Sequence, residues 1–281
     1  MQPANFNYHR ASTINEAESL CKDNADASFL AGGHSLIPAM KLRLAEPGAL
    51  VDISSIDDLK GISRDGDTIH IGALTTHAEV ESSDVVKEAC AALAEAAGMI
   101  GDPQVRNRGT IGGNVAHADP ASDYPGILMA LGATIVTSSR SIAVDDFFTG
   151  LFETALNEGE VIKEIQVPAL GDGSGAAYAK FFNPASRYAV VGVGAVVSME
   201  NRSCSSCTIG VTGAASHAFR ASTAEDLLTG SDLGEDAITT AAAKVAEDKE
   251  MLSDLSASAN YRIHLCSVMA KRAIVEAASR A

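Results

Sequence analysis

Two glycine-rich segments constrain this 281-residue chain more than any other feature of its sequence. Residues 31–35 read AGGHS, and residues 110–114 read TIGGN. The first segment follows a short apolar stretch, residues 27–30, and precedes a run with helical spacing, so it joins a predicted strand to a predicted helix. Glycine adopts positive φ values readily, and such a loop can turn consecutive backbone N–H groups toward one anion.

The two loops together predict a site for a diphosphate. Each N–H bond to a phosphate oxygen is charge-assisted and contributes roughly 1.5–3 kcal/mol. Thr110 and Asn114 add side-chain hydrogen bonds in the second loop. A single Gly-Gly pair is more typical of an ordinary tight turn, so the prediction depends on the segments that accompany both pairs.

The first 54 residues are predicted to form a compact α/β unit. Thr13 and Glu16 have the spacing of a capping box and begin a helix that runs toward Lys22. Ser35 is expected to cap a second helix with apolar positions up to Leu44, which the Pro-Gly pair ends before a strand at residues 50–53.

A second unit is predicted over residues 55–172 and a third over residues 173–281. The second unit has strand patterns at 68–71 and 161–167, a long alanine-rich helix at 84–97 and a helix-to-strand segment at 126–136. The cluster GDGSG at 171–175 is interpreted as a linker.

The third unit begins with three strand patterns and continues with helical segments, which favours a sheet covered by helices. Its predicted strands are residues 176–182, 189–199 and 207–212. Between the last two, SCSSC is interpreted as a turn, and its two cysteines lack the further ligands that a metal site needs. The segment GVGAVV lies inside a predicted strand and lacks a third glycine, so we do not expect a dinucleotide fingerprint there.

Composition limits the partners and the compartment. A net charge of −15 works against binding to nucleic acid or anionic lipid. The longest apolar run, residues 189–197, is too short to span a bilayer, and the N-terminus lacks a signal-peptide core. Five scattered cysteines do not form a disulfide framework. We therefore expect a soluble cytoplasmic protein with small molecules and proteins as partners.

The segments around both loops resemble, in order and over nearly the whole chain, the FAD-binding medium subunits of molybdenum hydroxylases of the carbon monoxide dehydrogenase type. The similar segments are LAGGHSLIPAMKLRLAEPGALVDIS, IGALTTH, GDPQVRNRGTIGGNVAHADPASDYP, DFFTGLFETALNEGEVIKEIQVP and SANYRIHLCSVMAKRAIVEAA. The resemblance implies an α+β fold, with a two-subdomain FAD-binding domain of the vanillyl-alcohol-oxidase (PCMH) type followed by an α+β domain of a sheet packed against helices.

The resemblance also implies noncovalent FAD on this chain. It implies [2Fe–2S] clusters on a small partner subunit and a molybdenum cofactor on a large one, assembled as a dimer of heterotrimers. Electrons would pass from the clusters through FAD to an external acceptor. No catalytic or metal-ligating residue is expected on this chain.

The resemblance places FAD against sixteen residues. Both loops would hold the diphosphate, Asp123 the adenosine side, and Val161 and Ile162 the ring system. Lys180 falls at a cofactor-contacting lysine, and Tyr188 at a residue against the isoalloxazine, although Arg187 stands where the family commonly has an acidic residue. The full set is Ala31, Gly32, Gly33, His34, Ser35, Leu36, Thr110, Ile111, Gly112, Gly113, Asn114, Asp123, Val161, Ile162, Lys180 and Tyr188.

Several alternatives remain open on the sequence. His34 follows Gly-Gly, as does the histidine that carries covalent FAD in oxidases of a related fold, so a self-contained FAD-dependent oxidase is the second hypothesis. A scaffold that has lost FAD is the third. Asp123 is also suited to a helix N-cap, and Tyr188 to an ordinary core or interface position.

Overall fold

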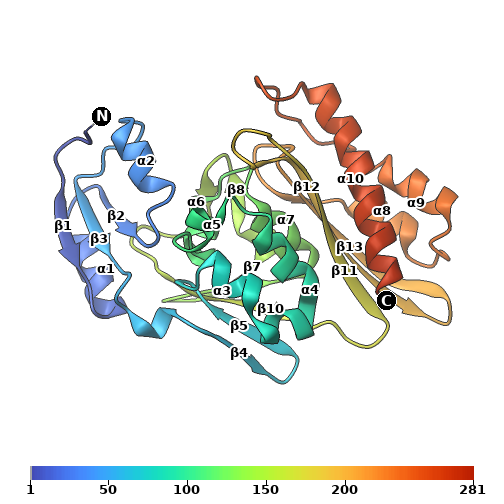
Figure 1. Cartoon of the computed structure of the whole chain (residues 1–281), viewed down its shortest axis with the longest axis horizontal. Helices are drawn as coiled ribbons and strands as arrows, with labels where there is room; N and C mark the ends of the chain where they lie inside the picture. Colours follow the sequence, from blue (N-terminus) through green and yellow to red (C-terminus); the bar gives the residue numbers. More distant parts are fainter. Residues whose placement is uncertain (1) are drawn as a thin grey trace.

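The N-terminal part of the chain forms a small parallel sheet flanked by two helices. The computed structural model describes residues 2–281. Its first elements are β1 (Asn7–Arg10), α1 (Ile14–Asp23), β2 (Ala27–Leu30), α2 (Leu36–Lys41) and β3 (Ala49–Asp52). The strand order is β1-β3-β2, and Ala49 of β3 pairs with both neighbours (Figure 1). The predicted order of strand, glycine loop, helix and strand is confirmed.

Local capping explains where α1 begins, whereas α2 is shorter than predicted. The Thr13 hydroxyl accepts from the Glu16 backbone N–H at 3.2 Å. The Glu16 carboxylate accepts from Ser12 rather than from Thr13. Ser35 occupies the N-cap of α2 without a side-chain cap bond. The helix ends at Lys41, because Arg43 adopts a positive φ of 58° that a helix cannot contain, and Leu44 beyond it is 79% exposed.

The middle of the chain forms a five-stranded antiparallel sheet with helices packed on it. Its elements are η1 (Asp57–Leu59), β4 (Ile62–Asp65), β5 (Thr68–Gly72), α3 (His77–Ser82), α4 (Asp84–Gly98), α5 (Pro103–Arg106), α6 (Ile111–His117), α7 (Asp123–Ala130), β6 (Thr134–Thr137), β7 (Ser141–Ala143), η2 (Val144–Asp146), β8 (Phe148–Gly150), β9 (Glu153–Thr154) and β10 (Ile162–Pro168). The sheet order is β4-β5-β10-β6-β7, with β8 and β9 as a separate hairpin.

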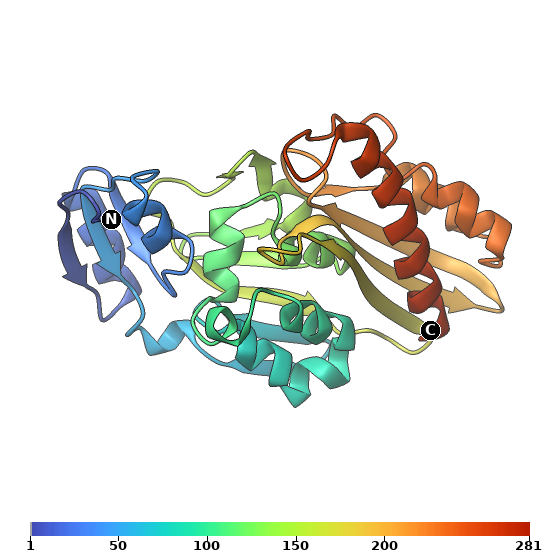
Figure 2. The ribbon, with the colours of Figure 1, turned by 45° about the horizontal axis from the view of Figure 1, so that its top comes forward.

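The C-terminal part is a four-stranded antiparallel sheet between helices. Its elements are β11 (Ser174–Phe182), β12 (Ala189–Glu200), β13 (Ser203–Thr212), β14 (Phe219–Arg220), α8 (Ser222–Leu228), α9 (Glu235–Ala242) and α10 (Ala259–Ser279). The long strands have α10 on one side and α7 of the middle part on the other (Figures 1 and 2). A Cβ atom at Gly210 would lie 2.1 Å from the Gly126 carbonyl oxygen, so glycines let this sheet approach α7 closely.

One interpretation of a local segment, the turn at SCSSC, is wrong, and the linker predicted at 171–175 is confirmed only for residues 171–173. SCSSC lies within β13, and the turn before it is Asn201–Arg202, where both residues have positive φ as a two-residue hairpin turn requires. The supposed linker already belongs to β11 from Ser174 onward. A Cβ atom at Gly175 would lie 2.1 Å from the Ala277 carbonyl oxygen, so this glycine permits the close approach of α10.

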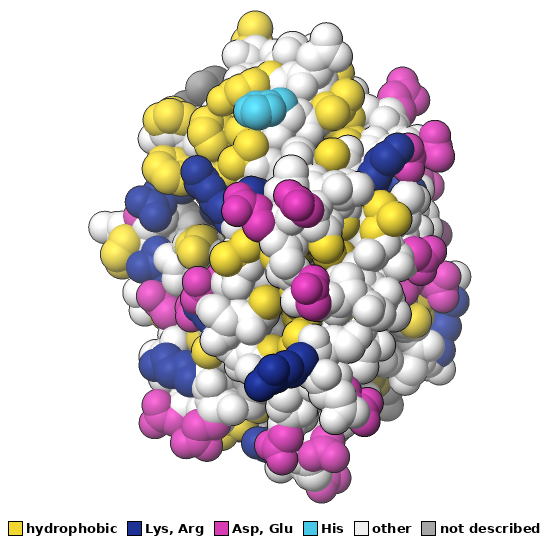
Figure 3. Space-filling model, turned by 90° about the vertical axis from the view of Figure 1, so that its right-hand side faces the viewer, with side chains coloured by type: hydrophobic (Ala, Val, Ile, Leu, Met, Phe, Trp, Pro, Cys, Tyr) yellow, Lys and Arg dark blue, Asp and Glu magenta, His cyan; other side chains and the backbone are white. Residues whose placement is uncertain are grey.

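The outer face of the C-terminal helices carries both charged and apolar side chains. Acidic and basic side chains are dispersed over most of this face, while apolar side chains gather near one histidine in its upper part (Figure 3). Exposed apolar residues of this region include Leu255, Tyr261 and Ile263. None of the helices in residues 2–281 is long and apolar enough to cross a membrane.

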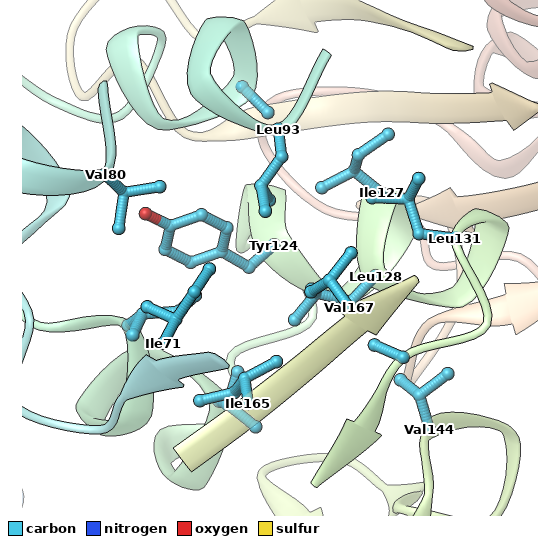
Figure 4. Close-up of a cluster of buried hydrophobic side chains, with 14 of the residues drawn as sticks. Ile71, Val80, Leu93, Tyr124, Ile127, Leu128, Leu131, Val144, Ile165 and Val167 are labelled. Atoms are coloured by element: carbon cyan, nitrogen blue, oxygen red, sulfur yellow. The ribbon is translucent and has the colours of Figure 1, made fainter. Parts of the chain in front are cut away.

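The buried apolar side chains form three clusters, and two of them join neighbouring parts of the chain: the N-terminal cluster includes Val161 of the middle part, and the central cluster includes Tyr178 of the C-terminal part. In the central cluster the Tyr124 ring of α7 lies among side chains of α3, α4, β5 and β10 (Figure 4). Leu93, Ile71 and Ile165 are each fully buried there. This core fixes α7, and therefore the position of Asp123 at its first turn.

Candidate functional site: a cavity between two glycine loops

The first loop presents unpaired backbone N–H groups to a cavity. Within residues 2–281, the N–H groups of Gly32, Gly33, His34 and Ser35 have no hydrogen-bond acceptor. All four residues line the same cavity. Gly33 has φ +74°, a left-handed conformation that favours glycine. Four N–H groups without acceptors in one turn form a concave site for an anion.

The second loop is built differently, because it is the first turn of α6. The Thr110 hydroxyl caps the helix by accepting from the Gly113 N–H at 3.1 Å. The N–H groups of Ile111 and Gly112 donate to the carbonyl oxygens of Thr75 and Ala73 at 3.0 and 2.9 Å. The expectation that this loop also turns its N–H groups outward at positive φ is therefore wrong for these three residues. They brace the cavity wall instead.

Close approach of the two loops depends on glycine. A Cβ atom at Gly32 would lie 2.0 Å from the Arg108 carbonyl oxygen, just before the second loop. A Cβ atom at Gly112 would lie 2.5 Å from the Ala73 Cβ. A larger residue at Gly32 would push the first loop away from Arg108 and Gly109, and one at Gly112 would push α6 away from Ala73.

The cavity has a volume of about 570 Å³, within the usual range for small-molecule sites. Of the sixteen residues predicted to contact the cofactor, fourteen line it. They are Ala31, Gly32, Gly33, His34, Ser35, Leu36, Thr110, Gly112, Gly113, Asn114, Asp123, Val161, Ile162 and Tyr188. The structure thus brings together residues from all three parts of the chain.

The other two predicted residues lie behind the cavity wall. Ile111 is fully buried in the central core. Lys180 of β11 is also buried, and its Nζ lies 2.8 Å from Asp123 Oδ2 and 3.1 Å from the Met99 carbonyl oxygen. Lys180 therefore holds Asp123 and does not line the cavity.

Asp123 is a buried carboxylate with two partners. Besides Lys180, the Tyr178 hydroxyl donates to its Oδ1 at 2.7 Å. Burial raises the pKa of Asp123 above its usual value, and the Lys180 ammonium and the Tyr178 hydroxyl oppose that rise. The N-cap of α7 is Ser122, so Asp123 is the first residue of the helix rather than its cap.

Two buried polar atoms at the cavity have no partner in residues 2–281: Asn114 Oδ1 and His77 Nδ1. Leaving a buried polar atom unpaired is unfavourable, which indicates that a ligand or water pairs with them. The open N–H groups of the first loop suit a phosphate, and the unpaired side-chain atoms suit sugar or ring polar groups. The residues present therefore fit FAD.

Tyr188 lies at the mouth of the cavity. Its side chain is 42% exposed, and it precedes β12. Burial of the hydroxyl raises its pKa, as does the Asp119 carboxylate, while the Ser35 hydroxyl of the first loop opposes this. The turn before Tyr188 therefore brings the C-terminal part of the chain to the first glycine loop.

The cavity residues that sequence reasoning missed include His77 and Glu160. Thr76 and Glu79 form a capping box, which could have located the start of α3 but not the direction of the His77 ring. Glu160 follows an acidic, glycine-containing turn that gave no signal of its partners.

Glu160 is held ionised by hydrogen-bond donors from four residues. They include Thr137 Oγ1 at 2.5 Å, Ser139 Oγ at 2.8 Å, Arg140 Nη2 at 3.1 Å and the Asn157 N–H at 2.8 Å. Burial of this carboxyl opposes ionisation, but the donors outweigh it and lower the pKa of Glu160 to about 2. The carboxylate thus fixes the loop before β10 against the end of β6.

We expect Glu160→Gln to lower the free energy of unfolding by about 3 kcal/mol at pH 7. A carboxyl whose folded-state pKa is depressed stabilises the protein above its unfolded pKa of about 4.5, and this contribution is lost as the pH falls toward 2. In urea denaturation, the difference in the free energy of unfolding between the wild type and Glu160→Gln should be smaller at pH 3 than at pH 7. Glu158→Gln, in the same loop but exposed, is the control and should change stability by less than about 0.5 kcal/mol.

Comparison with known proteins identifies the class. Residues 4–170 match the family described as FAD binding domain in molybdopterin dehydrogenase. Residues 176–277 match the CO dehydrogenase flavoprotein C-terminal domain. The chain belongs to the family of FAD-binding medium subunits of molybdenum hydroxylases. Its cofactor is FAD, and the predicted class, the FAD component of a molybdenum-containing dehydrogenase, is confirmed.

Two relatives of known name align with the whole chain. The chain is 39% identical to the carbon monoxide dehydrogenase medium chain of Hydrogenophaga pseudoflava, over 100% of this chain and 99% of that protein. It is 37% identical to the 6-hydroxypseudooxynicotine dehydrogenase complex subunit alpha of Paenarthrobacter nicotinovorans, over 100% and 97%.

Two solved structures have the same fold. Carbon monoxide dehydrogenase from Hydrogenophaga pseudoflava superposes with a TM-score of 0.97 at 40% identity, over 100% and 99% of the two chains. Quinoline 2-oxidoreductase from Pseudomonas putida 86 superposes with a TM-score of 0.93 at 30% identity, over 99% of each. The predicted α+β fold with a FAD-binding domain before a flavoprotein C-terminal domain is confirmed.

Proposed function

We propose that this chain holds FAD noncovalently in the cavity, with the diphosphate on the first glycine loop. The observation that carries this proposal is the row of four unpaired N–H groups at residues 32–35. No lysine or arginine stands in either loop, so backbone donors supply the binding. The His34 Nδ1 atom lies 3.3 Å from the Gly32 carbonyl oxygen within the loop. This contact supports a role for His34 in loop geometry rather than in a covalent link.

The other lining residues would contact different parts of the cofactor. Asp123 would contact the adenosine side, and Val161 and Ile162 the ring system, with Tyr188 against the isoalloxazine at the open end. Asn114 would pair its free Oδ1 with a cofactor donor. Lys180 would act through Asp123, because its ammonium is already engaged there. FAD supplies the redox chemistry when bound, and these residues supply position and electrostatics.

The chain serves as the electron-transfer component of a larger enzyme in this proposal. Electrons enter from [2Fe–2S] clusters of a small partner subunit and leave to an external acceptor, and substrate is oxidised at the molybdenum site of a large partner. The relatives support this, because several are named as chains or subunits of dehydrogenases or of a hydroxylase. A self-contained oxidase is the second candidate, and these relatives do not favour it.

The assembly, location and domain limits are also part of the proposal. We propose a dimer of heterotrimers in the cytoplasm, supported by the exposed apolar residues of the C-terminal face and by five free cysteines. Domain limits at residues 54/55 and 172/173 are supported by the three larger sheets, one of which lies in each part of the chain.

The colour and turnover of the purified chain test the function. We expect flavin absorption that acid precipitation releases completely into the supernatant. We also expect the isolated chain with FAD not to oxidise the substrate of the assembled enzyme. Flavin retained on acid-precipitated protein, or rapid flavin reduction by that substrate without partners, would favour the self-contained oxidase instead.

Tyr188→Ala should change turnover more than FAD content. An aromatic stacking contact contributes only about 0.5–1.5 kcal/mol beyond its area burial, whereas the diphosphate contacts include several charge-assisted bonds. Stopped-flow measurement of the reconstituted complex would follow flavin reduction and reoxidation separately, alongside FAD content. Tyr8→Ala, an exposed tyrosine of β1 that does not line the cavity, is the matched control. Complete loss of FAD in Tyr188→Ala, or unchanged rates in both directions, would contradict this placement.

A further inference from the structure

His77 is a buried side chain of the cavity wall to which the proposed function gives no role. It is the first residue of α3 and is 3% exposed. Its backbone N–H donates to the Gly109 carbonyl oxygen at 3.0 Å, and its ring centroid lies 5.3 Å from that of Tyr124. A Cβ atom at Gly109 would lie 2.6 Å from His77 Nε2, so the ring occupies space that a glycine leaves open. Three separate segments of the chain therefore build its position.

The ring has unused hydrogen-bonding capacity. Neither ring nitrogen has a partner among residues 2–281, and Nδ1 is fully buried. A neutral imidazole carries one N–H donor and one acceptor nitrogen. Folded proteins rarely leave such groups unpaired, and His77 borders a cavity that accepts a polar cofactor. We therefore expect a bound ligand to supply the hydrogen-bond partner of the His77 ring.

The groups that face His77 disfavour a charged ring. Burial, and then the positive charges of Arg106 and His34, lower the pKa of His77 to about 4. The Arg106 charge is fixed nearby, since its Nε lies 2.8 Å from Glu81 Oε2 and its Nη1 lies 3.1 Å from the Ile100 carbonyl oxygen. Tyr124, on the remaining side, is neutral because burial raises its pKa well above the usual value. Between pH 6 and 8 the ring is neutral.

We propose that His77 is a further FAD-binding residue, whose neutral ring donates a hydrogen bond to an oxygen of the diphosphate and sugar chain of the cofactor. The inference rests on the proposed function, which places FAD in this cavity. The ring lines the same cavity as both glycine loops, and it packs against Gly109, directly before the second loop. Oxygen atoms of the diphosphate and sugar chain are the acceptors expected where the loops meet.

FAD titration of the full chain, after removal of bound flavin, tests this. His77→Phe fills the same space without a donor, and we expect its Kd for FAD to rise about 10- to 100-fold. His77→Gln keeps a neutral donor of similar reach and should stay within about fivefold of the wild type. The control is His9→Phe: His9 of β1 also has a buried, unpaired Nε2 but does not line the cavity. It should leave the Kd within about twofold.

Circular dichroism and thermal unfolding without FAD show whether each variant folds. If phenylalanine is not accommodated, His77→Met, which also lacks an N–H, takes its place. An apolar variant that binds FAD within twofold of the wild type would overturn the inference. If the affinity of the wild type for FAD rises as the pH falls from 8 to 6, while that of His77→Gln stays constant, the ring gains a proton in this range. The proposal of a neutral ring would then be wrong. Wild-type protein that binds no FAD would overturn the proposed function as well, so the two failures are distinguishable.

Discussion

Replacing Gly33 by valine is expected to abolish FAD binding while most of the fold remains intact. Gly33 has φ +74°, and a side chain in that region costs roughly 1–2 kcal/mol, more for a β-branched residue. Its Cβ would also lie 2.7 Å from Ile37 Cδ1 of α2. The loop relieves both strains by rotating its peptide planes, which turns the N–H groups away from the diphosphate. Losing two charge-assisted bonds lowers the affinity at least about 100-fold.

Flavin content, FAD titration and circular dichroism together measure this effect. The matched control is Gly66→Val in the β4–β5 turn, because Gly66 has φ +55° and open space around it. This control carries comparable backbone strain outside the cavity and should keep its FAD. Full FAD occupancy in Gly33→Val would mean that the first loop does not bind the diphosphate.

Lys180→Met should be the most destabilising of the proposed changes. It removes the ammonium 2.8 Å from Asp123 and leaves a buried carboxylate whose other side-chain partner is the Tyr178 hydroxyl. Breaking a buried ion pair in this way costs about 3–5 kcal/mol. Without Lys180, burial raises the folded-state pKa of Asp123 further above its unfolded value. The penalty therefore applies fully well above that raised pKa and shrinks as the pH falls toward the unfolded pKa of about 4.

Urea denaturation at pH 8 and pH 5 should show a smaller stability deficit at pH 5. The double variant Asp123→Asn/Lys180→Met removes the charge altogether and should recover a large part of the loss. A deficit that is equal at both pH values, and that the double variant does not relieve, would show that Lys180 stabilises the protein through packing rather than charge.

Elements with a clear local pattern were predictable from sequence. β2 and the helical segment α4 follow from apolar spacing bounded by turn and cap residues, but the kink of α4 at Cys90, which has non-helical φ and ψ of −161° and 85°, does not. The SCSSC turn was misplaced because the true turn, Asn201–Arg202, contains no glycine or proline, although asparagine tolerates positive φ. The sequence therefore contained only a weak signal for this turn.

The sequence predicted free backbone N–H groups in both loops, but only the first loop has them facing the cavity. Both read as Gly-Gly before a helix, yet the N–H groups of Ile111 and Gly112 are used by the Thr75 and Ala73 carbonyl oxygens of a different segment. Pairing of that kind depends on tertiary packing, which a local motif does not contain. Similarly, Asp123 and Lys180 are 57 residues apart, so no spacing rule could show that the lysine binds the carboxylate rather than the cofactor.

The turn before Asp123 is held by residues of the C-terminal sheet. The Thr212 hydroxyl donates to the Pro120 and Ser122 carbonyl oxygens, and the Gly213 and Ala189 N–H groups donate to Pro120 and Ala121. During synthesis, a ribosome-bound chain that has exposed both glycine loops still lacks these braces. We therefore expect the chain to bind FAD only after the C-terminal sheet has left the exit tunnel. FAD would then bind to the completed chain and not to the nascent one.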